Sequence, residues 1–337
     1  MLQIEQNNLL IKNTLTEKIF SEDALSSKSL DRIITDFDFT LIHISSTLSE
    51  NNDVLLISIY LRCWEELSSY GVEDYLVNRY SRFFGPLTIL DKNKRQAGYN
   101  FSMTLDLGQL ASHDDSFKEE LIHALSSLKR FCISCPFDVA FSRYDELAKT
   151  YANSNTYSEE IQSQLMNEPT IVINYRGVDE SIYIKPSFDR VTVIFSTVFT
   201  DETDKIFGKV FLQEFLDARK RSVQNAPQVL YSHKVPPLDI QNLVKRVDNE
   251  NKGYVTFVLF PRHLVKGEKR ENTISHIQYF RTYFHYHIKC SKAYMHSRMR
   301  YRVREFLKIL NRAKPEYVNE EGKIEKKTAS GRRFDFN

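Results

Sequence analysis

The chain has 337 residues, of which 42% are hydrophobic and 27% are charged, values typical of a folded globular protein. This composition excludes an intrinsically disordered or collagen-like chain. The chain has only 10 glycines, which argues against dinucleotide-binding folds that use glycine-rich phosphate loops. No apolar run is long enough to predict a transmembrane segment, and 4 cysteines in a chain of this length favour a reducing, intracellular compartment.

Charge is distributed unevenly along the chain. From Pro261 to the end there are 19 Lys and Arg against 8 Asp and Glu, a net charge of +11. The preceding part holds 27 against 36, a net charge of −9. The sequence therefore predicts a basic C-terminal surface that meets an acidic partner such as nucleic acid, an anionic lipid or an acidic protein filament.

The first half of the chain mixes strand and helix patterns. Residues 33–44 and 54–61 are rich in β-branched and aromatic residues and predict strands. A helical stretch follows at 64–83, and the alternation in 99–107 predicts a half-buried strand. Ser116 and Glu119 have the spacing of a capping box, which predicts the start of another helix.

The second half repeats this order of elements after a polar connection at 151–164. Five strands are predicted, at 170–175, 181–185, 190–199, 228–233 and 253–260, with a helical region at 203–221. We therefore expect an α+β fold of two similar domains, 1–132 and 133–314. Each would be an antiparallel sheet packed by a C-terminal helix, and the last helix would be very long and projecting. Residues 315–337 are predicted to be a flexible polar tail.

The last predicted helix, Asn272–Lys314, is 43 residues long without Gly or Pro and would span roughly 63 Å. One apolar stripe runs along it, formed by Ile277, Phe284, Ile288, Met295, Met299, Val303, Phe306 and Leu310. A two-domain monomer cannot easily cover a stripe of this length. We expect part of it to pack on a long helix of another chain, although the two domains could instead cover it themselves.

The other faces of this helix are strongly basic. They carry Arg281, Lys289, Lys292, Arg298, Arg300, Arg302, Arg304, Lys308 and Arg312 against the single acid Glu305. A solvated helix usually mixes both signs, so this bias favours a negatively charged partner. Because tyrosines alternate with the basic residues, a nucleic-acid-binding protein remains an alternative.

The segment Asp36-x-Asp38-x-Thr40 is the main enzymatic candidate. An apolar strand followed by two aspartates in this spacing is similar to the first motif of haloacid-dehalogenase-type phosphatases, in which both carboxylates help to hold magnesium. A magnesium-dependent phosphatase is therefore an alternative function. The competing interpretation is a half-buried strand with Phe37 and Phe39 on one face and the polar residues on the other.

Cys132 and Cys135 could form half of a zinc site or a redox pair. Zinc needs further ligands nearby, and only the distant Cys63 and Cys290 remain among the cysteines. Buried free thiols are therefore favoured, and we predict no metal site, no cofactor and no catalytic residue.

Several blocks of sequence, in order, carry a family resemblance. They are DFDFTLIHIS (36–45), YNFSMTLDL (99–107), DRVTVIFSTVF (189–199), GKVFLQEF (208–215), APQVLYSH (226–233), GYVTFVLFPRH (253–263), HYHIKCSKAYMHSRMR (285–300) and FLKILNRAKP (306–315). In these blocks the chain resembles the family of subunit 2 of the actin-related protein 2/3 complex, an actin filament nucleator and brancher. Segments 85–98 and 145–168 and the tail are longer than expected of that family.

The resemblance implies a non-catalytic scaffold with two domains of one fold, in the cytoplasm and the cortical actin cytoskeleton. It implies that the last helix pairs with the corresponding helix of subunit 4, within a complex that binds actin filaments and not nucleic acid. The expected subunit interface is Phe284, Ile288, Met295, Met299, Val303, Phe306 and Leu310. By matching position, the resemblance implies filament contacts at Arg190, Lys308, Arg312 and Lys314.

Overall fold

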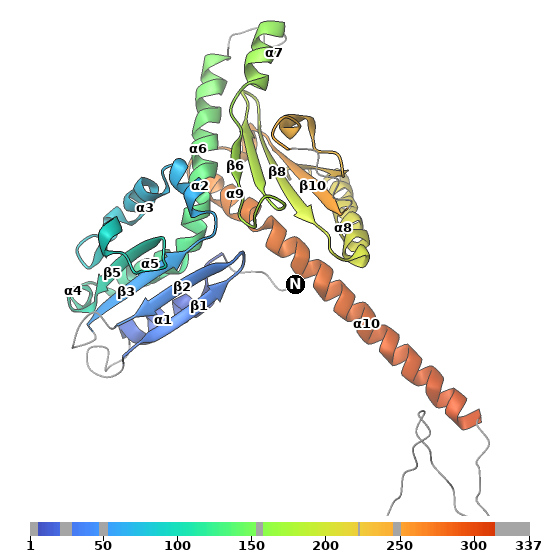
Figure 1. The fold of residues 1–337 in the computed structure, drawn as a ribbon, viewed down its shortest axis with the longest axis horizontal. Coiled ribbons are helices and arrows are strands. Elements are labelled where there is room, and N and C mark those ends of the chain that lie inside the picture. Colours follow the sequence, from blue (N-terminus) through green and yellow to red (C-terminus); the bar gives the residue numbers. More distant parts are fainter. Residues whose placement is uncertain are drawn as a thin grey trace, which may run out of the picture. The chain divides into compact units, whose positions relative to one another are not determined.

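The computed structural model describes residues 6–20, 29–46, 53–152, 158–221, 223–244 and 251–313. Helices and two five-stranded antiparallel sheets alternate along the chain (Figure 1). The expected α+β class is confirmed, and so is a long C-terminal helix. Within these residues no helix is long and apolar enough to span a membrane.

The first sheet has the strand order β1-β2-β3-β5-β4. Its strands are β1 (Asp31–Asp36), β2 (Thr40–Ser45), β3 (Val54–Tyr60), β4 (Leu87–Ile89) and β5 (Phe101–Asp106). β3 is the central strand of this sheet. Its alternate residues Leu55, Ile57 and Ile59 lie on one face and are fully buried there. On the other face the Ser58 hydroxyl lies 2.8 Å from the Ser102 hydroxyl, so this buried polar pair is satisfied.

Five α-helices accompany this sheet: α1 (Leu9–Phe20), α2 (Trp64–Ser69), α3 (Val72–Tyr80), α4 (Leu107–Ala111) and α5 (Asp115–Ser126). The helix predicted over 64–83 is in fact α2, α3 and the 3-10 turn η1 (Ser81–Phe83). Gly71, with φ of 80°, lies between α2 and α3 in a conformation that favours glycine. The predicted capping box at Ser116 is wrong, because the N-cap of α5 is Asp114, two residues earlier.

The second sheet repeats the topology of the first, with the order β6-β7-β8-β10-β9. Its strands are β6 (Ile171–Ile173), β7 (Ile182–Pro186), β8 (Val191–Val198), β9 (Gln228–His233) and β10 (Lys252–Leu259). The other elements are α7 (Glu159–Met166), α8 (Glu202–Arg221) and the 3-10 turns η3 (Leu238–Ile240) and η4 (Pro261–His263). Identical strand order in both sheets confirms the repeated element order expected from the sequence.

Two predicted connections contain regular structure. The segment 85–98 contains β4 and the 3-10 turn η2 (Lys92–Lys94). The segment 145–168 contains the end of α6 (Leu128–Thr150) and α7. Both segments are therefore partly regular structure and not only connecting loops.

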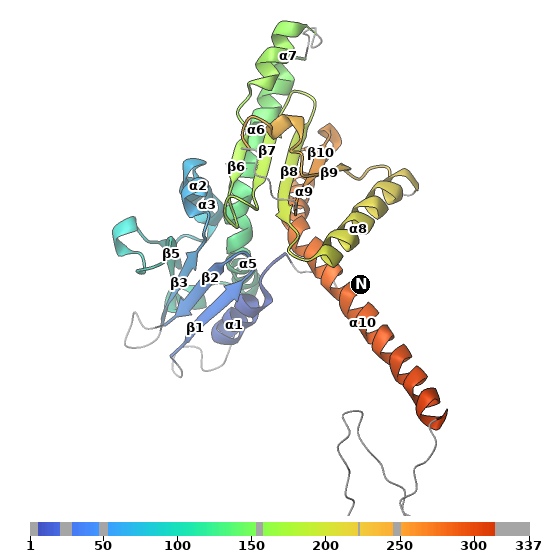
Figure 2. The same cartoon turned by 45° about the vertical axis from the view of Figure 1, so that its right-hand side comes forward.

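Helix α6 connects the two halves of the fold. It packs on α2, α3 and α5, and also on β7, β8 and α9 (Glu268–Gln278). Figure 1 shows its ribbon between the two sheets, and in Figure 2 the same helix overlaps the strands of the second sheet. The predicted domain boundary at residues 132–133 falls within this helix, and the division into domains stays a prediction.

The prediction of a single helix over 272–314 is wrong in two respects. The helical region begins earlier, with α9 after Gly267, and it is interrupted at Tyr279 before α10 (Phe280–Ala313). A tertiary contact accompanies the interruption, since the Tyr279 hydroxyl donates a hydrogen bond of 2.8 Å to the Gln6 carbonyl. By its contacts the chain forms two units, 1–284 and 285–337, so the first residues of α10 belong to the first unit.

Candidate interaction helix and ion-pair relay

The C-terminal part of α10 exposes a row of large apolar side chains. The exposed fractions of Met295, Met299, Val303, Phe306 and Leu310 are 48%, 59%, 56%, 60% and 43%. Steps of three and four residues place these side chains on one face of the helix. We call this row the apolar stripe; its geometry matches a seam that packs against a second helix.

Phe284 and Ile288 differ from the stripe, because they are only 3% and 0% exposed. The Phe284 ring stacks on Phe280 with centroids 5.4 Å apart and meets Phe199 edge-on at 6.1 Å. Both residues were predicted to face another subunit. Their burial within this chain argues against a direct contact with another subunit, and the exposed part of the row begins at Met295; the interface assignment stays a prediction.

Basic side chains occupy the remaining faces of α10, and Glu305 is its only acid. Two tyrosines on this helix contact its arginines. Arg298 lies over the Tyr294 ring at 5.5 Å and donates a hydrogen bond of 2.8 Å to its hydroxyl. Arg304 lies over the Tyr301 ring at 5.4 Å. These contacts hold aromatic rings among positive charges on the exposed helix.

The residues predicted to contact a filament lie in different parts of the chain. Lys308 is on α10 and pairs with Glu305 at 2.9 Å, and Arg312 is exposed in the last turn. Arg190 lies just before β8 in the first unit and pairs with Asp189. Lys314 lies outside the described residues. The structure tests none of these four as filament contacts.

The residues Asp36–Thr40 form a hairpin turn. Strand β1 ends at Asp36, β2 begins at Thr40, and the intervening residues turn with φ of 62° at Asp38 and 58° at Phe39. The predicted single strand over 33–44 is therefore wrong. So is the expectation of a half-buried strand face, because Phe37 and Phe39 are 56% and 57% exposed.

This geometry does not support the phosphatase interpretation. The two aspartates lie in an antiparallel hairpin, whereas the phosphatase motif requires the end of a strand in a βαβ arrangement. The ammonium group of Lys129 lies 3.7 Å from carboxylate oxygens of both Asp36 and Asp38, so it already neutralises part of their charge. In the described ranges no three His, Cys, Asp or Glu side chains gather as a possible metal site.

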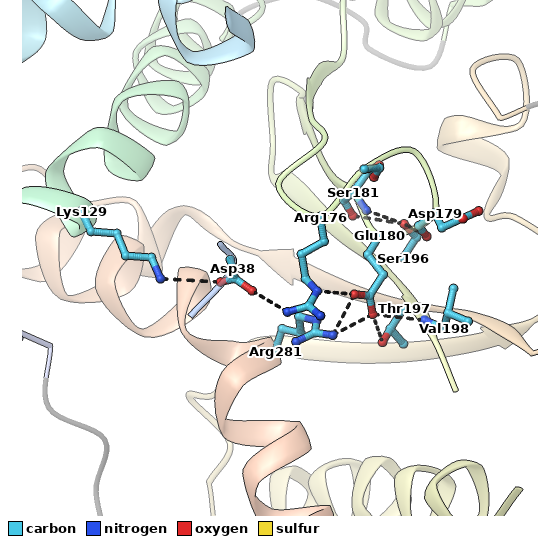
Figure 3. Close-up of polar contacts among 11 residues, drawn as sticks. Asp38, Lys129, Arg176, Asp179, Glu180, Ser181, Ser196, Thr197, Val198 and Arg281 are labelled. Atoms are coloured by element: carbon cyan, nitrogen blue, oxygen red, sulfur yellow. Dashed lines mark hydrogen bonds and ion pairs between the residues drawn. The ribbon is translucent and has the colours of Figure 1, made fainter. Parts of the chain in front are cut away.

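Instead, Asp38 is part of a chain of opposite charges (Figure 3). Lys129 donates a hydrogen bond of 2.6 Å to the Phe37 carbonyl and faces Asp38. On the other side, Arg176, in the β6–β7 loop, donates a bond of 3.2 Å to the Asp38 carboxylate. The hairpin of the first sheet is thereby joined to a loop of the second.

The chain of charges continues to the first turn of α10. Glu180 lies 2.6 Å from the Arg176 guanidinium and accepts two bonds, of 2.9 and 2.7 Å, from Arg281. The Thr197 hydroxyl and the Val198 amide, at the end of β8, also donate to Glu180, at 3.2 and 3.3 Å. We call Lys129, Asp38, Arg176, Glu180 and Arg281 the ion-pair relay.

Glu180 is the most buried acid of the relay, with 8% of its surface exposed. Burial alone would raise the pKa of Glu180, but Arg281, the Val198 amide and Arg176 outweigh it, so the pKa lies below its ordinary value. Asp138 in α6 shows the opposite shift. Its pKa is raised, mainly by burial and also by the nearby negative charge of Glu271, and these outweigh the lowering effects of Tyr75 and Arg79. The two carboxyls therefore give opposite pH dependences.

A carboxyl with a lowered native pKa stabilises the fold above its ordinary value of about 4.3, and this contribution disappears as pH falls through the lowered native pKa. Glu180→Gln is therefore expected to lower the urea midpoint of the full-length chain at pH 7. The fall in this midpoint between pH 7 and pH 3 should be smaller for the variant than for the unmodified chain. Asp138→Asn is the matched control and is expected not to lower the midpoint at pH 7. Equal losses from both variants at pH 7 would contradict this assignment.

The cysteines of α6 are buried free thiols, as predicted. Burial raises the pKa of Cys135 to about 12 and also raises that of Cys132. Both side chains are therefore protonated at neutral pH, which does not suit the thiolate chemistry of a metal or redox site.

Most of the relay cannot be recognised from the sequence. Arg281 is one of nine basic residues on its helix, and no motif marks Lys129, Arg176 or Glu180. Arg176 and Asp38 are 138 residues apart, and Arg281 and Glu180 are 101 apart. Such a network is found only when contacts between distant positions are known. Covarying pairs in an alignment of homologues can indicate such contacts.

The chain is similar in sequence to known proteins over nearly its whole length. A family model described as "Arp2/3 complex, 34 kD subunit p34-Arc" matches residues 57–317. The chain is 44% identical to actin-related protein 2/3 complex subunit 2 of Schizosaccharomyces pombe over 335 residues, 99% of each chain. It is 33% identical to the protein of the same name from Dictyostelium discoideum over 338 residues, 100% of each chain.

Proposed function

Because the chain belongs to the p34-Arc family of Arp2/3 complex subunits, we propose that it is a non-catalytic scaffold subunit of an actin-related protein 2/3 complex. It pairs with subunit 4 and contacts the side of the mother actin filament during nucleation of branched networks. Its place is the cytoplasm, in the cortical actin cytoskeleton. The observation that carries the proposal is the exposed apolar stripe flanked by basic residues on α10.

Pairing with subunit 4 is supported by the energetics of the helix. An isolated helix is marginally stable in water, and most helices are stabilised by packing of an apolar face. The five residues of the apolar stripe leave that face about half exposed. A second long helix with its own apolar face would remove both surfaces from water, at about 25 cal/mol for each Å² buried.

Contact with a filament is supported by charge. Nine Lys and Arg residues against one acid make α10 strongly positive. Actin filaments are acidic, and a positive patch facing a negative one raises the association rate and fixes orientation. Since the stripe occupies one face for pairing, the basic faces remain for the filament.

A double charge reversal tests the filament contact. In the assembled complex, Lys308→Glu with Arg312→Glu is expected to weaken co-sedimentation with actin filaments roughly tenfold or more, since each close charge pair contributes about 1 kcal/mol or more. Branch formation should fall in parallel. The complex itself should purify intact, because neither residue belongs to the apolar stripe.

Lys209→Glu with Lys220→Glu on α8 is the matched control, since it changes the net charge equally at exposed positions. It should leave filament binding nearly unchanged. Normal binding by the α10 variant, or equal weakening by both variants, would refute Lys308 and Arg312 as filament contacts.

A further inference from the structure

We propose that the ion-pair relay fixes the first turn of α10, the helix that carries the apolar stripe, by coupling this turn to the β1–β2 hairpin of the first sheet. Asp38 and Arg176 are then positioning residues for a surface that they do not touch. The inference rests on the proposed function of α10 and adds a second region of the chain to it. Three kinds of contact in the structure support it.

The first support is the conformation of the hairpin turn. Asp38 and Phe39 both have positive φ, which is unfavourable for residues other than glycine and rare for a bulky side chain. Such a turn persists only where its surroundings hold it. Here the Phe39 ring lies 5.4 Å from the guanidiniums of both Arg62 and Arg176. The turn is therefore held by the same arginine that continues the relay.

The second support is the balance of charge. With Asp36, which Lys129 also contacts, the relay contains three positive and three negative side chains. The side chains of Lys129, Glu180, Asp38 and Arg281 are between 9% and 15% exposed. Removing one member leaves its neighbours poorly solvated and with one ionic partner fewer, so the members are expected to act as a unit.

The third support is the place where the relay ends. Arg281 is the second residue of α10, and the rings of Phe280 and Phe284 pack beside it in the first unit. α10 is one continuous helix from Phe280 to Ala313, so these contacts fix the first turn of the helix that carries the apolar stripe. A change at the hairpin would therefore reach α10 through Arg176 and Glu180.

Hydrogen exchange of the assembled complex tests this coupling. Asp38→Asn removes the charge that faces Lys129 and Arg176. The rate of amide hydrogen exchange is expected to rise roughly tenfold in the peptides covering residues 280–290 and 176–181. This is the size of effect expected when local structure loses one hydrogen bond between charged groups. Filament affinity should fall several-fold. Arg176→Lys should reproduce both effects, because the guanidinium reaches Asp38 through Nη1 and Glu180 through Nε, and a lysine lacks this rigid fork of separate donors.

Asp31→Asn is the matched control, because it breaks the Asp31–His43 contact in the same hairpin without touching the relay. It should leave exchange in 280–290 unchanged. Equal effects of Asp31→Asn and Asp38→Asn, or no change in 280–290 with Asp38→Asn and with Arg176→Lys, would overturn the proposal.

A double variant distinguishes a relay from two separate contacts. Asp38→Asn combined with Glu180→Gln should be no worse for exchange in 280–290 than Glu180→Gln alone, since the effect of Asp38 reaches α10 only through Arg176 and then Glu180. Additive effects would overturn the relay. The exchange result stands apart from filament binding, so failure of the Lys308 and Arg312 variant would refute the filament role and leave this test valid.

Discussion

Replacing Met299 with Asp is expected to prevent stable association of the chain with subunit 4. Met299 lies in the middle of the apolar stripe and is 59% exposed in the chain alone. A carboxylate at this position would be desolvated in a helix seam without a cationic partner, at a cost on the order of several kcal/mol. Since each 1.4 kcal/mol changes affinity about tenfold, the complex should lose more than a hundredfold in stability.

The measurement is co-purification of subunit 4 and the other subunits with the tagged full-length chain. Ser297→Asp is the matched control, because residues two apart on a helix point about 160° apart and Ser297 lies away from the stripe. Both variants should show the same helix content by circular dichroism, since both positions are exposed. Normal recovery of subunit 4 with Met299→Asp would remove the stripe from the proposed interface.

Much of the second sheet could be predicted from the sequence, because its strands are continuous runs of β-branched and aromatic residues bounded by turn residues. β8 and β10 are such strands, and both are buried over nearly their whole length. The hairpin at Asp36–Thr40 could not be predicted, because its turn has no glycine to signal positive φ. The short strand β4 and the helix α1 were also missed, since neither shows a clear periodic pattern over its length.

The candidate site was predictable only in part. Helical periodicity correctly placed one apolar stripe along the last helix, but periodicity does not say which chain covers each residue of a stripe. Phe199, Phe280 and Gly208 cover Phe284, and these contacts depend on the tertiary fold. The relay was harder to predict, because its members are isolated charged residues on four separate segments: the β1–β2 hairpin, α6, the β6–β7 loop and α10.

The burial of Phe284 and the exposure of Phe306 predict opposite roles for two phenylalanines of the same helix. Phe284→Ala is expected to lower the free energy of unfolding of the full-length chain by about 3–5 kcal/mol, because it removes a buried ring and leaves a cavity. Phe306→Ala makes the same chemical change at a residue that is 60% exposed, so the chain's own stability should change by no more than about 0.5 kcal/mol. Urea unfolding of each variant measures both values.

The same two variants should have the opposite order of effect on recovery of subunit 4. Phe306→Ala removes an apolar anchor from the seam and should weaken recovery of subunit 4, although the chain remains as stable as before. Phe284→Ala should affect recovery only to the extent that the chain unfolds, so low temperature should restore it. A stable Phe284→Ala chain that fails to bind subunit 4 would return Phe284 to the interface. It would also show that the partner surface begins before Met295.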